Sequence, residues 1–123
     1  MTPTDIVLHR QSGDLEVAWA DGTQFSLPSE LLRVRSPSAE VQGHSPDQAV
    51  LQTGKRSVRI TAVEPQGNYA IRIVFSDGHD TGIFTWTYLH HLGTHLDAVW
   101  QEYLDALAAA GASRDPVVIA SSR

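Results

Sequence analysis

The stretch NYAIRIVFSDGHDTGIFTWTYLHHLG, residues 68–93, decides the fold, because a strand, a tight turn, a second strand and a short helix follow one another there without a gap. Its first strand alternates apolar and more polar residues, so the apolar side chains share one face of a sheet. These side chains are Tyr69, Ile71, Ile73 and Phe75. Asp77 and Gly78 supply the turn, because glycine adopts positive φ without steric cost. Thr85 is placed to cap the helix, and Gly93 to end it.

The same order of elements occurs earlier in the chain, in AWADGTQFSLPSELL at residues 18–32. There too a strand, an Asp-Gly turn, a strand and the start of a helix follow one another. Two explanations stay open: a duplicated ββα unit, or the recurrence of Asp-Gly hairpins through turn chemistry alone. Short β-rich segments at residues 5–10, 15–19 and 58–63 predict further strands.

A longer amphipathic helix is predicted from Leu96 onward, because apolar residues recur there at the i, i+3, i+4 spacing of a helix that packs on a sheet. Thr94 is placed to cap this helix, and Gly111 to end it. We therefore predict a single α+β domain over residues 1–111. It has a mixed or antiparallel sheet of about five to six strands, on which a short helix and the C-terminal amphipathic helix pack. Residues 112–123 are expected to form a flexible C-terminal tail.

The composition limits the partners that the domain is expected to bind. Hydrophobic residues make up 41% and charged residues 19% of the 123 residues, which is typical of a globular domain. The formal net charge of -5 argues against nucleic acid as a partner, because neutralising phosphates needs clustered Lys and Arg. No run of about 18 apolar residues occurs, so no membrane span is predicted, and we expect a cytoplasmic protein.

The sequence carries no complete catalytic motif. It has no cysteine, which excludes disulfides, thiolate zinc sites and cysteine nucleophiles. It has neither a G-x-S-x-G motif nor a Gly-rich phosphate loop. We therefore expect no enzyme activity and no cofactor.

Residues 36–57 predict an irregular loop of about 20 residues, because they contain two prolines and two glycines and lack an apolar period. Loops of this length are uncommon inside a compact domain and are often functional. We predict an interaction surface where the first part of this loop meets the turn after the central strand. Its residues are Ser36, Pro37, Ser38, Glu40, His44, Asp77, Gly78, His79 and Asp80.

Two histidines stand where a metal ion could bind. His79 follows the Asp-Gly turn beside Asp80, and His44 lies in the long loop close to Glu40 and Asp47. If the loop folds against the turn, His44 and His79 with a carboxylate form a site for Zn²⁺ or Fe²⁺. The alternative is that His79 is a hydrogen-bonded structural residue of the turn.

The segments LRVRSPSAEVQGH (32–44), LQTGKR (51–56) and NYAIRIVFSDGHDTGIFTWTYL (68–89), with the helix that follows, carry a family resemblance. They resemble the DUF971 family, a small bacterial family of unknown function that is similar to the N-terminal domain of γ-butyrobetaine hydroxylase. Similar domains are attached to iron–sulfur carrier ATPases. The resemblance therefore implies an accessory role beside metallocofactor or oxygenase chemistry.

The resemblance also implies which positions correspond to metal ligands. In the hydroxylase relatives this domain holds a structural zinc through cysteines and a histidine, and the matching positions here are Ser36, Ser38, Val41 and His79. Serine hydroxyls bind zinc poorly and valine does not bind it, so only His79 remains a zinc ligand. The iron and 2-oxoglutarate site of the hydroxylase belongs to a second domain, so the resemblance does not imply that activity.

Together these features predict a non-catalytic accessory domain that binds another protein of unknown identity and that is a monomer or a weak homodimer. The alternative is a small metal-binding module in which His44 and His79 hold Zn or Fe weakly.

Overall fold

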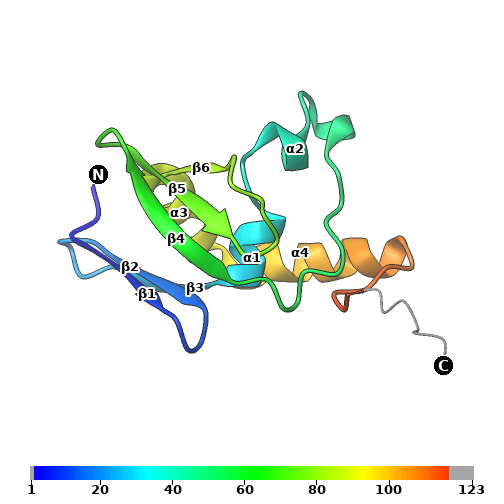
Figure 1. Cartoon of the computed structure of the whole chain (residues 1–123), viewed down its shortest axis with the longest axis horizontal. Coiled ribbons are helices and arrows are strands. Elements are labelled where there is room, and N and C mark those ends of the chain that lie inside the picture. Colours follow the sequence, from blue (N-terminus) through cyan, green and yellow to red (C-terminus); the bar gives the residue numbers. More distant parts are fainter. Residues whose placement is uncertain (1, 117–123) are drawn as a thin grey trace.

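The structure, a computed structural model, describes residues 2–116. Within these residues the chain forms two three-stranded antiparallel sheets, of order β1-β2-β3 and β4-β5-β6, together with four α-helices (Figure 1). The strands are β1 (Asp5–His9), β2 (Asp14–Ala18), β3 (Gln24–Pro28), β4 (Ile60–Gln66), β5 (Ala70–Phe75) and β6 (Ile83–Thr85). The helices are α1 (Ser29–Val34), α2 (Ala39–Gln42), α3 (Trp86–Thr94) and α4 (Leu96–Ala109), with the 3-10 turn η1 (Pro46–Gln48). The predicted α+β class is confirmed, although the strands divide between two sheets.

The first half of the domain is a three-stranded meander that leads directly into a helix. β1 pairs with β2 in the register Ile6↔Val17, and β2 pairs with β3 in the register Val17↔Phe25. α1 begins at Ser29, directly after Pro28, whose φ of -66° and missing N–H suit the position before a helix. The helix therefore starts without any connecting loop.

The second half repeats this order of elements. β5 pairs with β6 in the register Ile71↔Phe84, and the hydroxyl of Thr85 caps α3 by accepting the backbone N–H of Tyr88 at 3.1 Å. Each half is thus a meander of three strands that runs directly into a helix. This shared order agrees both with a duplication and with recurrent turn chemistry.

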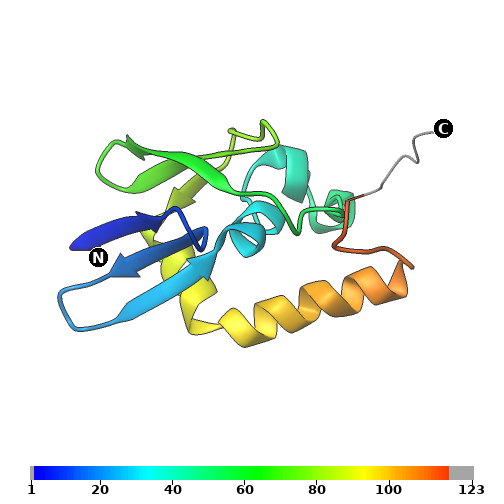
Figure 2. The same ribbon diagram turned by 60° about the horizontal axis from the view of Figure 1, so that its bottom comes forward.

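One apolar cluster joins the inner faces of both sheets to α1 and α3. Its fully buried side chains include Leu15, Phe75, Phe84 and Leu89. Removing a side chain of this size from water contributes about 2 kcal/mol to stability. Figure 2 shows the two sheets at one end of the molecule and α4 extending away from them.

Two residues of the 68–93 stretch, and Thr94 directly after it, have roles that differ from the prediction. Tyr69 precedes β5 and is 57% exposed, so it does not share the buried face of Ile71. Gly93 does not end α3; a Cβ at this position would lie 2.2 Å from the Phe25 ring, so glycine is what allows α3 to sit against β3. Thr94 is the last residue of α3 and does not cap α4, which has no side-chain cap.

A second, smaller apolar cluster anchors α4, in which Tyr103 and Leu107 pack with Val34. Among residues 2–116, no helix is both long enough and apolar enough to span a membrane.

Residues 112–116, the first part of the predicted tail, return along the domain. The Ser113 carbonyl accepts the backbone N–H of Gly54 at 2.9 Å, and Arg114 forms a two-point ion pair with Glu30 at 2.9 and 2.7 Å. The remainder of the predicted tail, residues 117–123, lies outside the described residues.

Candidate functional site

The long loop and the turn between β5 and β6 meet at a polar junction, which we define as Ser36, Ser38, Glu40, His79 and Thr81. α1 ends just before Ser36, and the turn carries His79 and Thr81 into contact with the loop. Ser36, Ser38 and His79 are buried, with 0%, 7% and 8% exposure, whereas Glu40 and Thr81 are exposed, so the junction reaches from the interior of the protein to its surface.

His79 is the centre of the junction. Its Nε2 lies 2.8 Å from the Ser36 hydroxyl, and its Nδ1 lies 3.2 Å from a carboxylate oxygen of Glu40. A carboxylate only accepts, so Nδ1 carries the proton and Nε2 accepts the Ser36 O–H. The ring therefore bonds two positions of the loop at once.

The remaining hydroxyls complete the network. Thr81 donates to the Glu40 carboxylate at 2.9 Å and lies 2.6 Å from the Ser38 hydroxyl. Since the Thr81 proton goes to Glu40, Ser38 donates to Thr81. Ser38 also accepts the backbone N–H of Glu40 at 3.2 Å, which caps α2. Each buried hydroxyl of the junction thus has a partner, as burial of polar groups requires.

Asp77 holds the turn between β5 and β6 in position through three hydrogen bonds. Its carboxylate accepts Arg33 Nε at 2.8 Å, Lys55 Nζ at 2.7 Å and the backbone N–H of His79 at 3.2 Å. Burial raises the pKa of Asp77, but the hydrogen bonds from Lys55 and Arg33 outweigh it and lower the pKa to about 2. Asp77 is therefore ionised at neutral pH and fastens the turn to α1 and to the end of the long loop.

The pKa of His79 is lowered from its ordinary value. Burial disfavours the charged ring, and the positive charge of Arg33 acts in the same direction; the carboxylates of Glu40 and Asp77 oppose the shift without cancelling it. The lowered pKa favours the neutral ring at pH 7, which is the form in which Nε2 accepts the Ser36 hydroxyl.

The connectivity Ser36, His79, Glu40 is that of a Ser-His-acid triad. A nucleophile must be reached by its substrate, however, and Ser36 is 0% exposed. Its hydroxyl faces Gly82, where a Cβ would lie 2.4 Å from the Ser36 Oγ. In this arrangement the Ser36 hydroxyl holds the loop in place and is not available to attack a substrate.

The junction does not fit the structural zinc that the resemblance implies. The hydroxyls of Ser36 and Ser38 are engaged with His79 and Thr81, and Val41 is buried with 3% exposure. Across residues 2–116, no group of three or more His, Cys, Asp or Glu side chains is arranged to hold a metal ion. Ser36, Ser38 and His79, three of the four positions that the resemblance assigns to zinc ligands, are engaged in hydrogen bonds, and the fourth is the apolar side chain of Val41.

The predicted metal pair is divided between the junction and the surface. His44 follows α2, is exposed, and donates its backbone N–H to the Gln48 side chain at 3.2 Å. His79 is buried and bonded as described above. Of the other predicted surface residues, Glu40, Asp77 and Gly78 are exposed, whereas Pro37 and Asp80 are half-buried.

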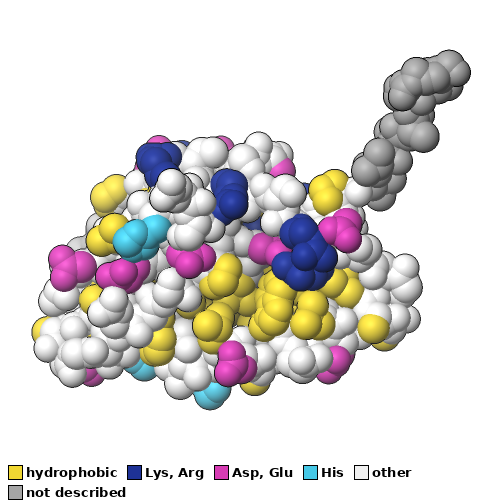
Figure 3. Space-filling model, turned by 90° about the horizontal axis from the view of Figure 1, so that it is seen from below, with side chains coloured by type: hydrophobic (Ala, Val, Ile, Leu, Met, Phe, Trp, Pro, Cys, Tyr) yellow, Lys and Arg dark blue, Asp and Glu magenta, His cyan; other side chains and the backbone are white. Residues whose placement is uncertain are grey.

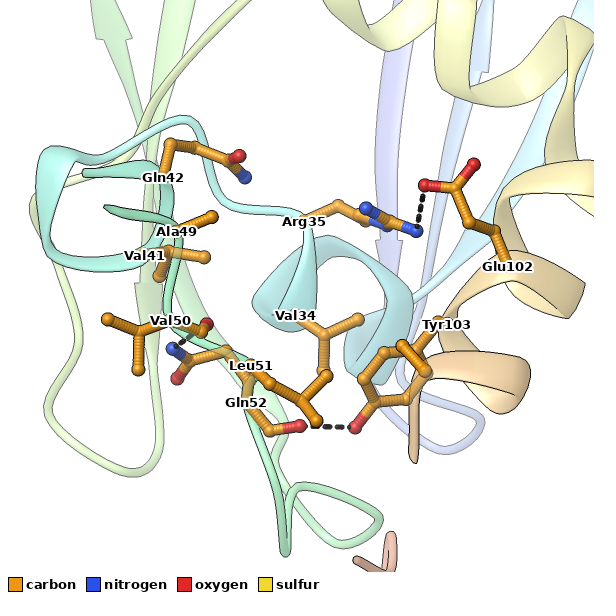
Figure 4. Close-up of a pocket in the computed structure, with 11 residues that line it drawn as sticks. Val34, Arg35, Val41, Gln42, Ala49, Val50, Leu51, Gln52, Glu102 and Tyr103 are labelled. Atoms are coloured by element: carbon orange, nitrogen blue, oxygen red, sulfur yellow. Dashed lines mark hydrogen bonds and ion pairs between the residues drawn. The ribbon is translucent and has the colours of Figure 1, made fainter. Parts of the chain in front are cut away.

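Beside the junction, the long loop borders a hollow of about 200 Å³, which we call the α2 hollow (Figure 4). It lies between the end of α1, α2, residues 49–52 and the C-terminal half of α4. Val50 and Leu51, at its edge, are 56% and 36% exposed, which is high for side chains of their size. The only sequence signal for this site is the apolar run Ala49, Val50, Leu51 within an otherwise polar loop.

Two contacts hold the walls of the α2 hollow. The Tyr103 hydroxyl donates to the Gln52 carbonyl at 2.7 Å, and Arg35 pairs with Glu102 at 3.1 Å. Figure 4 shows these contacts at the two sides of the hollow. They join the long loop and the end of α1 to α4.

These features define a class: a small α+β domain of two strand meanders, in which a turn histidine fastens a long loop. Residues 6–90 match the model of the family described as gamma-butyrobetaine hydroxylase-like, N-terminal, and the chain belongs to this family. No curated protein matches the chain.

Solved structures agree with this assignment. Two NMR solution structures are 48% and 46% identical to the chain, with TM-scores of 0.82 and 0.80. Each alignment covers 99% of this chain, and 96% and 91% of those chains. A crystal structure from Acidithiobacillus ferrooxidans, of a DUF971-family protein of unknown function, is 42% identical, with a TM-score of 0.64 over 75% of this chain and 92% of that one. The resemblance inferred from the sequence is confirmed.

Proposed function

We propose that the chain is a non-catalytic accessory domain that binds another protein through the loop surface, defined as Glu40, His44, Val50, Leu51 and the α2 hollow. The observation that supports this most directly is the exposure of Val50 and Leu51 at the edge of a shaped hollow. Exposed apolar side chains beside a hollow are typical of contact surfaces.

The polar junction gives the loop surface a fixed shape before any partner arrives. His79, Thr81 and Asp77 hold the loop by hydrogen bonds at both of its ends. A surface that is already ordered loses less conformational entropy on binding than a flexible loop does. Val41, the buried residue of α2, lines the hollow, which links the junction to the contact surface.

The partner belongs, on this proposal, to an oxygenase or metallocofactor system. The family description, gamma-butyrobetaine hydroxylase-like, N-terminal, supports this direction. The absence of cysteine suits a cytoplasmic location, where thiol pairing has no role. The domain acts as a monomer or a weak homodimer.

Photocrosslinking at position 50 tests the proposal. A photoreactive amino acid is introduced at Val50 and, as a matched control, at Val7, which is 42% exposed on β1. We expect position 50 to give one discrete cross-linked protein in cells and position 7 to give none. Leu51→Asp should abolish that cross-link while the protein stays folded, with a small fall in melting temperature, since Leu51 is 36% exposed. Identical cross-links from both positions would contradict the proposal.

The metal-binding alternative is supported only by the approach of His79 Nδ1 to Glu40, at 3.2 Å. Metal analysis of untagged protein and the thermal shift on adding Zn²⁺ or Fe²⁺ separate it from the main proposal. A metal site at His44 and His79 requires a stabilisation that disappears in His79→Ala. Equal responses of wild type and variant would eliminate the alternative.

A further inference from the structure

Two histidines lie one helical turn apart at the end of α3. They are His91, in the last turn of this helix, and His95, the one residue between α3 and α4 (Figure 2). The backbone N–H of His95 donates to the His91 carbonyl at 3.0 Å, so the helical spacing of i and i+4 extends to His95. The centres of the two imidazole rings are 4.8 Å apart, so the rings lie side by side.

The histidine pair lies on the solvent side of α3. Gly93 is two positions after His91, about 200° around the helix, and it packs against the Phe25 ring of β3. His91 and His95 therefore point away from the sheet, and both are exposed. An ion in solution reaches both rings without any change in the fold.

The ring nitrogens of the pair have no competing partner. Three other histidines, His9, His79 and His90, each have a ring nitrogen bonded to another side chain. In the part of the chain that the structure describes, no hydrogen bond or ion pair involves a ring nitrogen of His91 or His95. A neutral imidazole has a free lone pair on one nitrogen, and here it is available to a metal ion.

Tyr88 orients the His91 ring. The two rings are stacked, with 18° between their planes and 6.5 Å between their centres. The Tyr88 hydroxyl in turn donates to the Arg35 carbonyl at 2.5 Å, which fixes the tyrosine. A ring that is already oriented loses less side-chain entropy when it binds an ion.

We propose that His91 and His95 form a two-point site for a divalent transition-metal ion, such as Zn²⁺, Cu²⁺ or Ni²⁺, with water in the remaining coordination positions. Two nitrogens that each lie about 2 Å from one ion are at most about 4 Å apart. Rings whose centres are 4.8 Å apart reach this separation by side-chain rotation. Imidazole suits these ions, whereas Mg²⁺ and Ca²⁺ prefer oxygen ligands. With two protein ligands in place of the four of a structural zinc site, the ion exchanges and is removed by a chelator.

The overall charge of the chain favours a cation as the ligand. The formal net charge is -5, and Figure 3 shows acidic side chains spread over one face of the molecule. The site lies outside the loop surface and needs no protein partner, so it goes beyond the proposed function. It also shares no residue with the pair His44 and His79 of the metal-binding alternative.

A Zn²⁺ titration of the untagged full chain, followed by NMR, tests the proposal. We expect one ion per chain, with shifts centred on the ring signals of His91 and His95 and on the amides of residues 88–96. Cu²⁺ bound at the site should show the EPR couplings of two nitrogen ligands. Mg²⁺ and Ca²⁺ should cause no such shifts.

Single variants provide the matched comparison. His91→Ala and His95→Ala should each weaken Zn²⁺ binding roughly tenfold or more, because the second nitrogen no longer binds from within the same molecule. His9→Ala, at another exposed histidine, should leave the affinity unchanged. All three positions are exposed, so the variants should stay folded, which the melting temperature without metal checks.

Several results would overturn the inference. Equal Zn²⁺ affinity of wild type and His91→Ala, or EPR couplings of a single nitrogen, would show that the two rings do not bind one ion together. Shifts of equal size at all histidines would indicate an adventitious ion only. Binding that is lost in His44→Ala but kept in His91→Ala would assign the metal to the alternative pair.

Discussion

The Ser36 hydroxyl lies 2.8 Å from Nε2 of His79, across a sequence separation of 43 residues. This one hydrogen bond joins the long loop after α1 to the turn between β5 and β6. Because both groups are buried, water does not replace the bond when one partner is removed.

His79→Ala should therefore lower the free energy of unfolding by about 2 kcal/mol. The substitution leaves the Ser36 hydroxyl without its acceptor and Glu40 without one of its donors. Urea unfolding measures the change. His95→Ala, at an exposed position, serves as control and should stay within about 0.5 kcal/mol of wild type.

The lowered pKa of His79 predicts a pH dependence of stability. Its folded-state pKa lies below the unfolded value, so the unfolded chain binds the proton more tightly between the two values. The contribution of neutral His79 is fully present above about pH 6.5 and is lost as pH falls below it. Urea unfolding from pH 8 to pH 5 should show this loss, and His79→Gln should flatten it. If the free energy of unfolding of His79→Gln falls with pH in parallel with that of wild type, His79 does not have this role.

Asp77→Asn should destabilise the protein by about 2 kcal/mol, because it leaves the buried guanidinium of Arg33 without its carboxylate. Since the pKa of Asp77 is about 2, this contribution is present above about pH 4 and is lost as pH falls toward 2. Thermal unfolding at pH 7 measures the effect. Asp47→Asn, an exposed acid in η1, is the control and should leave the melting temperature unchanged.

Gly82→Ala should destabilise by about 1 to 3 kcal/mol through crowding, since the added Cβ would lie 2.4 Å from the Ser36 Oγ and 3.0 Å from Phe84. Part of this cost should vanish when Ser36 is also changed to alanine. A double-mutant cycle by urea unfolding should therefore give a smaller total than the sum of the single effects. If the two changes in the free energy of unfolding are strictly additive, there is no steric crowding between positions 82 and 36.

The triple variant Ser36→Cys, Ser38→Cys, Val41→Cys should acquire a zinc site with His79, if the loop follows the path that the family resemblance implies. Thiolates and an imidazole supply the four ligands of a tetrahedral site. Metal analysis should give one zinc per chain, and a chelator should lower the melting temperature. Adding His79→Ala should weaken this zinc binding; undiminished binding would place the ligands elsewhere.

Much of the fold is predictable from local sequence patterns. The alternation around Ile71 and the Asp-Gly turn at Gly78 predict the β5–β6 hairpin, and the helical spacing from Leu96 predicts α4. The division into two sheets is not predictable in this way, because a period of two identifies the buried face of a strand and not its partner.

The site is predictable only in part. The sequence indicates that the long loop and the turn of His79 matter, but the burial of Ser36, Ser38 and His79 depends on packing between distant segments. The Glu30–Arg114 pair joins residues 84 positions apart, and no local pattern reports such a contact. In the sequence, the α2 hollow is indicated only by the short apolar run at residues 49–51.

The two meanders have a consequence for how the chain reaches its fold. The strand pairing among the described residues stays within residues 5–28 or within residues 60–85, so each sheet forms by closing short loops. Short loops cost little entropy to close, and such pairing is fast. The shared apolar core and the bond between Ser36 and His79 connect the two meanders, so we expect both to form last, when the two sheets pack against each other.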